Sequence, residues 1–344
     1  MAAVLLKGHG GFEQLEYRRD VAVPRPAPQE VLVRIGAAAL NNTDINTRTG
    51  WYSACGRGAA DAGWRGGAVQ FPRIQGADAC GRIVAVGTGV DPARLGERVL
   101  IDPVLRGARQ GGYFGSDCDG AFAEFAAVPA INACRVESAL TDAELASFPC
   151  AYGVAEHMLT RAGVAAGETV LVTGASGGVG SAAVQLARRR GARVIAQTAS
   201  DKAGVVASLG AERLIGRDAD LARELGPESV DVVVDVVGGD AFVARLGVLR
   251  RRGRCVVAGA VAGAQVRLDL RTLYLRDLQL TGCTLFEPPV FRALIGYIER
   301  GEIRPLVCAT YALADIVSAQ QRFLAAGHLG KIVLVPAPAA ESAG

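Results

Sequence analysis

The stretch LVTGASGGVGSAAVQLARRRGARVIAQTAS, Leu171–Ser200, decides the fold class of this chain. Its first residues end a strand-like apolar run, Glu168–Thr173, and apolar side chains then recur at helical spacing over Val179–Arg190. Between the two runs stand the glycines Gly174, Gly177, Gly178 and Gly180. A glycine-rich turn between a strand and a helix is typical of a dinucleotide-binding βαβ unit.

The glycine turn predicts a pyrophosphate site. Without side chains the backbone approaches the phosphates closely, and the N–H groups that open the helix donate to the phosphate oxygens. We predict that these contacts come from Gly174, Ser176, Gly177, Gly178 and Val179. The alternative is a turn whose glycines serve only the close packing of strand and helix.

The residues at the end of the next strand indicate which nucleotide is bound. In NAD-binding units an acid about 20 residues after the glycines binds the ribose 2′-hydroxyl. Here Gln197 and Thr198 are neutral, and Ser200 and Lys202 follow. Hydroxyl and ammonium donors bind a 2′-phosphate, so we predict NADP(H), although Asp201 is a nearby acid that could bind the ribose instead.

The second half of the chain alternates between strand-like and helical patterns. The strand-like runs are 168–173, 193–198, 213–215, 230–238 and 253–259, and the helical runs are 179–190, 203–209, 218–225 and 241–249. This alternation predicts a parallel sheet with helices on both faces. The runs Arg188–Arg190 and Arg250–Arg252 each precede a glycine, as cations do at the end of a helix.

We add two further predicted cofactor contacts, Gly259 and Thr284.

The first 130 residues have a different pattern. Short β-rich runs at 30–38, 81–87 and 97–101, separated by glycine and proline, predict a small, mostly antiparallel barrel. The sequence Thr141–Glu144 has the form of a capping box that opens a helix toward Ser147. Near the end we expect one more helix and a strand, Lys331–Val335.

Composition excludes several classes of protein. A chain of 344 residues predicts two domains, and a net charge of +3 is too small to indicate nucleic acid. No apolar run is long enough to span a bilayer, and the first residues lack the pattern of a secretory signal. The eight cysteines are scattered without a CxxC pair, so we expect reduced thiols and a cytoplasmic location.

With the glycine turn, the β-rich first half and the ending GHLGKIVLVP, the chain resembles the medium-chain dehydrogenase/reductase superfamily. The resemblance implies an α/β protein with a GroES-like β-rich catalytic barrel and a Rossmann doubly wound parallel sheet. The barrel would comprise residues 1–130 and 288–344, and the Rossmann domain 131–287. It also implies a homodimer or homotetramer paired through sheet edges, for which Gln265–Asp269 and Leu278–Thr281 are candidates.

Two branches of that superfamily differ in their use of zinc. At the positions of the Cys, His and Cys ligands of the zinc branch, this chain has Asn41, Ala77 and Cys150. The zinc-free quinone oxidoreductases and enoyl reductases commonly have Asn-x-x-Asp followed by Arg-x-Gly-x-Tyr, which Asn41–Asp44 and Arg48–Tyr52 match. The resemblance therefore implies no catalytic metal.

The same resemblance suggests where the chemistry takes place. It carries Lys202 and Arg217 over as contacts of the adenosine phosphate. Without a metal, a conjugated enone or quinone is an easier hydride acceptor than a ketone, because charge spreads over an enolate that hydrogen bonds stabilise. The candidate catalytic residues are Asn41, Thr43, Asp44 and Tyr52. Alternatively, Asn41 and Asp44 cap a helix and Tyr52 is only a wall of the site.

Three functions follow from these patterns. The leading one is an NADPH-dependent, zinc-free reductase of activated alkenes or quinones, with a small-molecule substrate of enone, quinone or aldehyde class. The second is an alcohol or aldehyde dehydrogenase with an altered metal site built from Cys150, Asp78 or Asp44. The third is a non-catalytic NADPH-binding sensor or partner protein.

Overall fold

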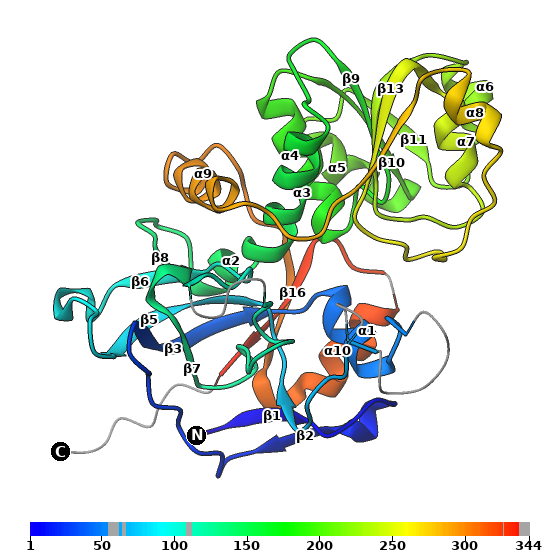
Figure 1. Cartoon of the computed structure of the whole chain (residues 1–344). Coiled ribbons are helices and arrows are strands. Elements are labelled where there is room, and N and C mark those ends of the chain that lie inside the picture. The colour runs from blue at the N-terminus through cyan, green and yellow to red at the C-terminus, as the bar shows by residue number, and fades with distance from the viewer. Residues whose placement is uncertain (54–61, 64–66, 108–111, 326, 337–344) are drawn as a thin grey trace. The chain divides into compact units, whose positions relative to one another are not determined.

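The computed structural model describes residues 1–53, 62–63, 67–107, 112–325 and 327–336. The chain divides into two compact units, and each is described by itself (Figure 1). The β-rich unit consists of Met1–Cys150 with Pro305–Gly344, and the Rossmann unit consists of Ala151–Arg304.

The Rossmann unit is built on one parallel sheet. Its six strands follow the order β11-β10-β9-β12-β13-β14, and every neighbouring pair is parallel. Their bounds are β9 (Thr169–Val172), β10 (Arg193–Thr198), β11 (Arg213–Gly216), β12 (Val230–Asp235), β13 (Leu249–Val257) and β14 (Gln279–Gly282). All residues of β9 and β12 are buried, as the continuous apolar runs predict for central strands.

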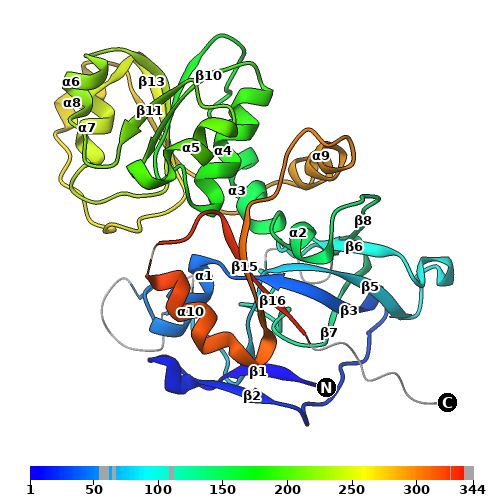
Figure 2. The same ribbon diagram turned by 180° about the vertical axis from the view of Figure 1, so that it is seen from behind.

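Helices cover both faces of this sheet, as predicted. In Figures 1 and 2, α4 and α5 lie on one side of the sheet and α6 and α7 on the other. The helices are α3 (Pro149–Arg161), α4 (Gly178–Arg189), α5 (Ala203–Ser208), α6 (Leu221–Leu225), α7 (Phe242–Gly247), α8 (Leu270–Tyr274) and α9 (Pro288–Glu299), with a 3₁₀ turn η6 (Ser200–Lys202). In the described part of the chain, no helix combines the length and the apolar character needed to cross a membrane.

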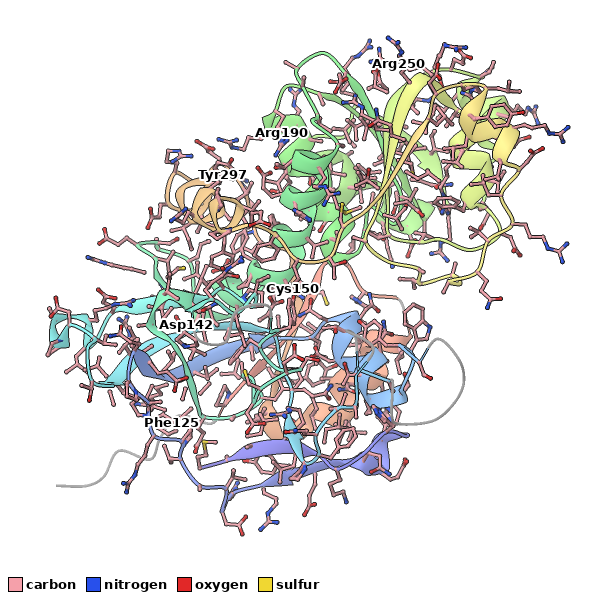
Figure 3. The ribbon with its side chains drawn as sticks, viewed as in Figure 1. Phe125, Asp142, Cys150, Arg190, Arg250 and Tyr297 are labelled. Carbon is pink, nitrogen blue, oxygen red and sulfur yellow. The ribbon has the colours of Figure 1, made fainter. Side chains whose placement is uncertain are left out.

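One basic run ends a helix and the other does not. Arg190 is the C-cap residue of α4, and Gly191 follows with φ +79°, so the prediction for Arg188–Arg190 is confirmed. The prediction for Arg250–Arg252 is wrong, because these residues lie within β13. There Arg250, labelled in Figure 3, pairs with Asp231 of the neighbouring strand β12 at 2.5 Å, so a carboxylate of the sheet rather than a helix end holds this cation.

The two candidate sheet-edge segments also differ from each other. Gln265–Asp269 forms no strand, whereas β14 is the strand at one edge of the six-stranded sheet.

The β-rich unit contains two mostly antiparallel sheets. One has the order β15-β16-β3-β5-β6-β8 with β7 also paired to β3, and the other has the order β2-β1-β4. Among the strands of this unit that the structure describes, β15 and β16 are the pair that runs parallel. The strands are β1 (Ala3–Leu6), β2 (Leu15–Arg18), β3 (Glu30–Ala39), β4 (Arg73–Ile74), β5 (Asp78–Val86), β6 (Arg98–Ile101), β7 (Phe125–Pro129), β8 (Ala133–Arg135), β15 (Val307–Ala312) and β16 (Lys331–Val335). The helices are α1 (Asn42–Thr49), α2 (Asp142–Ala146) and α10 (Ile316–Leu324), with 3₁₀ turns η1 (Phe12–Gln14), η3 (Pro92–Arg94), η5 (Ala130–Asn132) and η7 (Leu313–Asp315). One apolar core joins side chains of β1, β3, β5, β6, β7 and β16.

The units divide after Cys150 and after Arg304, rather than after residues 130 and 287 as the sequence suggested. Two sets of contacts account for the difference. The capping box of Thr141 opens α2 as predicted, and Asp142 in its first turn accepts from Arg98 Nε of β6 at 2.8 Å, which holds α2 to the β-rich unit. Helix α9, which carries Tyr297 (labelled in Figure 3), instead belongs to the Rossmann unit, where the Arg189 guanidinium lies 3.5 Å from the centre of the Tyr297 ring.

We expect Gly180→Ala to destabilise the Rossmann unit by about 1–3 kcal/mol. A Cβ atom at Gly180 would lie 2.2 Å from the carbonyl oxygen of Gly174, and both atoms belong to the rigid glycine turn. The matched control is Gly204→Ala on α5, where a Cβ atom meets nothing within 4 Å and a helical alanine should stabilise by up to about 1 kcal/mol. Urea unfolding of both variants would measure the two free energies, and equal effects would contradict the prediction.

Candidate active site

Helix α1 begins with a cap that uses the carboxylate of Asp44. Asn41 is the N-cap residue, and its backbone N–H donates to Asp44 Oδ2 at 2.8 Å. A carboxylate in the first turn satisfies a free backbone donor and also interacts favourably with the helix dipole. The capping alternative is therefore correct for Asp44, which is buried.

The side chain of Asn41 is held on both of its polar atoms. Its Oδ1 accepts from Lys331 Nζ at 2.6 Å, and its Nδ2 donates to Asp78 Oδ2 at 2.9 Å and to the carbonyl of Ala39 at 3.3 Å. Both amide protons thus go to acceptors of the protein. The side-chain oxygen, which is the atom of Asn41 that could bind a metal ion, already accepts a hydrogen bond from the Lys331 ammonium.

Lys331 and Asp78 complete a buried polar ring, by which we mean the side chains of Asn41, Asp78 and Lys331. Lys331 Nζ lies 2.8 Å from Asp78 Oδ2, and the two side chains are 5% and 0% exposed. The second oxygen, Asp78 Oδ1, accepts from the backbone N–H of Cys150 at 2.5 Å, in the first turn of α3. Strand pairing brings the ring together, because Ala39 at the end of β3 is opposite both Asp78 and Val333.

Burial dominates the titration of the groups around the ring. It raises the pKa of Asp44 to about 7, against the lowering effects of the Asn41 N–H and Lys331. It also raises the pKa of Cys150 to about 12, so this thiol stays protonated at neutral pH. The phenol of Tyr113 donates to Cys150 Sγ at 3.3 Å. A protonated, hydrogen-bonded thiol is a poor nucleophile.

Thr43, in the first turn of α1, and Tyr52, in the turn after that helix, form a second polar group. The Tyr52 hydroxyl donates to Thr43 Oγ1 at 3.1 Å, and both side chains are half-buried. Burial raises the pKa of Tyr52, so the phenol keeps its proton at neutral pH. Because the Thr43 oxygen accepts the hydrogen bond from Tyr52, its own hydroxyl proton is available to a further acceptor.

The residues at the zinc-ligand positions do not fit a zinc ion. Asn41 Oδ1 and Asp78 are bound to Lys331, Ala77 offers a buried methyl group, and Cys150 is a single thiol. Zinc in a catalytic site requires three protein ligands, usually thiolate, imidazole or carboxylate. Within the described residues, no group of three His, Cys, Asp or Glu side chains is arranged to hold a metal.

The start of α4 fits a pyrophosphate. Gly177 is its N-cap residue and has no side-chain cap, and Ser176, Gly177, Gly178 and Val179 are half-buried. A Cβ atom at Gly177 would meet only the Gly174 carbonyl, at 3.5 Å, so the uncapped N–H groups are accessible to an anion. Gly174, at φ +57°, makes the turn that presents them.

The other predicted cofactor residues lie at neighbouring strand ends. Thr198 of β10 is opposite Gly216 of β11, which places Arg217 next to the end of β10. Lys202 is buried, whereas Ser200, Arg217 and Thr284 are exposed. The Thr198 hydroxyl is buried and makes no hydrogen bond. Gly259 is half-buried, and a Cβ atom there would lie 2.9 Å from the Val236 carbonyl.

Sequence reasoning missed three residues of the site. Lys331 appeared only as the start of a strand, Asp78 only as a substitute metal ligand, and Tyr113 not at all. A signal existed for Lys331, because it is one of three lysines in the chain and it opens an apolar run. Nothing local pointed to Tyr113.

Comparisons with known proteins agree with this geometry. Family models for "Zinc-binding dehydrogenase" and "Alcohol dehydrogenase GroES-like domain" match residues 178–300 and 27–138. Acryloyl-coenzyme A reductase of Metallosphaera sedula is 32% identical, over 97% of this chain and 99% of that protein. The chain belongs to the medium-chain dehydrogenase/reductase superfamily.

Further members of the superfamily are similar over the whole length. Quinone oxidoreductase of Lama guanicoe is 28% identical and covers 97% of each chain. A solved structure from Sinorhizobium meliloti 1021, provisionally named an alcohol dehydrogenase, is 47% identical with a TM-score of 0.90, over 98% of this chain and 96% of that one. The predicted superfamily and fold class are confirmed, and the protein is an oxidoreductase of the medium-chain type.

We expect Lys331→Met to destabilise the β-rich unit by about 3–5 kcal/mol, because it leaves the Asp78 carboxylate buried without its cation. The double variant Asp78→Asn/Lys331→Met also removes the charge of the Asp78 carboxylate and should recover part of the lost stability. Lys7→Met is the matched control, since the Lys7–Glu16 pair is exposed and 3.7 Å apart, and it should cost less than about 1 kcal/mol. Denaturant unfolding would measure all three, and a double variant no more stable than Lys331→Met would contradict the ion-pair explanation.

Proposed function

We propose that the protein is an NADPH-dependent, zinc-free reductase of carbon–carbon double bonds conjugated to a carbonyl group, or of quinones. The observation that carries the proposal is the buried polar ring, in which the Lys331 ammonium engages Asn41, at one of the superfamily's zinc-ligand positions, and the neighbouring Asp78 carboxylate. The names of the relatives, an acryloyl-coenzyme A reductase and a quinone oxidoreductase, support this substrate class.

Without a metal, the hydrogen-bond donors of the site determine which substrates it can reduce. A simple ketone relies on a strong electrophile at its oxygen, and a metal contributes several kcal/mol there. A conjugated substrate accepts hydride at carbon, and the developing negative charge is delocalised onto an enolate or phenolate oxygen. Neutral hydrogen-bond donors then suffice to stabilise the transition state.

In our proposal Thr43 and Tyr52 supply these donors. The Thr43 hydroxyl donates to the developing oxyanion, while the Tyr52 phenol donates to Thr43 over 3.1 Å. The addition of one hydride and one proton across the double bond is completed by a proton that comes either from Tyr52 through Thr43 or from solvent. Asn41 and Asp44 hold the start of α1, on which Thr43 stands.

The cofactor preference rests on the Rossmann unit. The nicotinamide supplies the hydride when the cofactor is bound. The end of β10 carries no acid at Gln197 or Thr198. Lys202 follows this strand end shortly in the chain, and Arg217 lies beside it because β11 pairs with β10. A 2′-phosphate gains charge-assisted hydrogen bonds from such cations, whereas the 2′-hydroxyl of NADH gains little.

A substrate panel tests the proposed reaction. We expect NADPH oxidation with enones, enoyl thioesters or quinones, no stoichiometric zinc by elemental analysis, and no loss of rate with a chelator. Thr43→Val should lower kcat roughly 100- to 1,000-fold, the usual cost of removing an oxyanion donor. Tyr17→Phe, which alters a partly buried tyrosine packed on the apolar core, is the matched control and should leave kcat unchanged.

The alternatives predict other outcomes. One zinc per subunit, with activity lost to chelation and restored by zinc, would indicate the alcohol or aldehyde dehydrogenase. Tight NADPH binding without turnover of any panel member would indicate a sensor or partner protein. Full activity of Thr43→Val would reject the donor role that we assign to Thr43.

We also propose that the protein forms a homodimer, or a tetramer of dimers, through the edge of the Rossmann sheet. Strand β14 ends the sheet, and Leu280 on it is 38% exposed. Leu270, Tyr274 and Leu275, in and after α8, are more than half exposed. An apolar sheet edge of this kind pairs readily with a second copy.

Light scattering at micromolar concentration tests the assembly. We expect Leu280→Arg to reduce the mass to that of a single chain, because a guanidinium at the edge opposes pairing. Leu95→Arg, at a leucine of the β-rich unit that is 50% exposed, should leave the mass unchanged. A monomeric mass for the unaltered protein would contradict the proposal.

A further inference from the structure

The side chain of Gln197 joins two strands at the predicted cofactor site. Its Nε2 donates to the carbonyl of Arg217 at 2.9 Å and approaches the carbonyl of Gly216 at 3.4 Å. Gln197 lies near the end of β10, and the two acceptors end β11 and begin the loop after it. The amide therefore ties the backbone of Arg217 to the strand end where a Rossmann unit binds the adenosine ribose.

The backbone of Gln197 makes a second connection. Its carbonyl accepts from the N–H of Ala175, inside the glycine turn, at 3.1 Å. One residue thus contacts both the turn that fits a pyrophosphate and the loop that carries Arg217. Few side chains could do this, because the position needs a donor long enough to cross from β10 to β11.

Because the Gln197 side chain is buried, the loss of its hydrogen bond to the Arg217 carbonyl would be costly. Gln197 is 6% exposed, so its N–H group has no water to replace a lost acceptor. Arg217 is exposed, and no carboxylate pairs with it in the described part of the chain. Pairing of β10 with β11 places the backbone of Arg217 next to the end of β10, and the hydrogen bond from Gln197 is the side-chain contact that holds it there.

We propose that Gln197 is a specificity-determining positioning residue, which selects NADPH by holding Arg217 beside the adenosine 2′-phosphate. The inference rests on the proposed NADPH preference and deepens it. The buried Thr198 hydroxyl, which has no hydrogen-bond partner, lies at the same strand end. Gln197 itself need not touch the cofactor.

A double-mutant cycle on cofactor binding tests this role. Dissociation constants for NADPH and NADH would be measured by calorimetry for the unaltered protein, Gln197→Met, Arg217→Ala and the double variant. We expect Gln197→Met and Arg217→Ala each to weaken NADPH about five- to tenfold and to leave NADH within about twofold. The double variant should bind NADPH no more weakly than Arg217→Ala, because Gln197 acts through Arg217.

Two further variants separate positioning from folding. Gln185→Met removes another buried glutamine of the Rossmann unit, one that bonds Tyr152 and Arg304, and should change neither dissociation constant. Gln197→Asn keeps an amide but is too short to reach Arg217, and it should behave as Gln197→Met does.

The outcomes separate this inference from the proposed function. Equal binding of NADPH and NADH by the unaltered protein would overturn both. A clear NADPH preference that Gln197→Met and Gln197→Asn leave intact would overturn the role of Gln197 alone. Equal weakening of both nucleotides, or additive losses in the double variant, would show that Gln197 supports the sheet without directing Arg217.

Discussion

The buried contact among Lys331, Asp78 and Asn41 is the constraint on which the rest of the β-rich unit depends. A carboxylate placed in an apolar interior is costly unless a cation and hydrogen bonds compensate it. Lys331 supplies the cation, and Asn41 and the N–H of Cys150 supply the hydrogen bonds. These partners join β16, β5, the N-cap residue of α1 and the backbone of Cys150, so their positions in the β-rich unit are set together.

This arrangement determines which chemistry the site can support. The carbonyl of Asn41 and both oxygens of Asp78 are occupied, and burial keeps the Cys150 thiol protonated. A divalent metal would have to displace the ammonium before it found ligands. In our proposal Thr43 and Tyr52 are the neutral donors of the site, which suits a substrate that delocalises its own negative charge.

The Rossmann unit solves a different problem, the recognition of a large anion. Open N–H groups at the start of α4 fit the pyrophosphate without any charged side chain, because the helix dipole supplies the positive end. Discrimination between NADPH and NADH requires a positive charge at a second place, the end of β10, and we propose that Arg217 supplies it. Gln197 links the two places through one backbone and one side-chain hydrogen bond, so in our proposal phosphate binding and nucleotide choice depend on the same residue.

Local patterns in the sequence determined much of this fold. Strands β10 and β16 have the predicted bounds, and the glycine turn stands between β9 and α4, because side-chain periodicity and glycine conformation act over a few residues. The same local logic failed for Arg250–Arg252, where carboxylates of other segments decide the environment. Only the tertiary structure could reveal the polar ring, since Lys331 and Asn41 are 290 residues apart and meet through the pairing of β16 with β3. A strand's own sequence specifies that it pairs, but the partner and register depend on the packing of the whole unit.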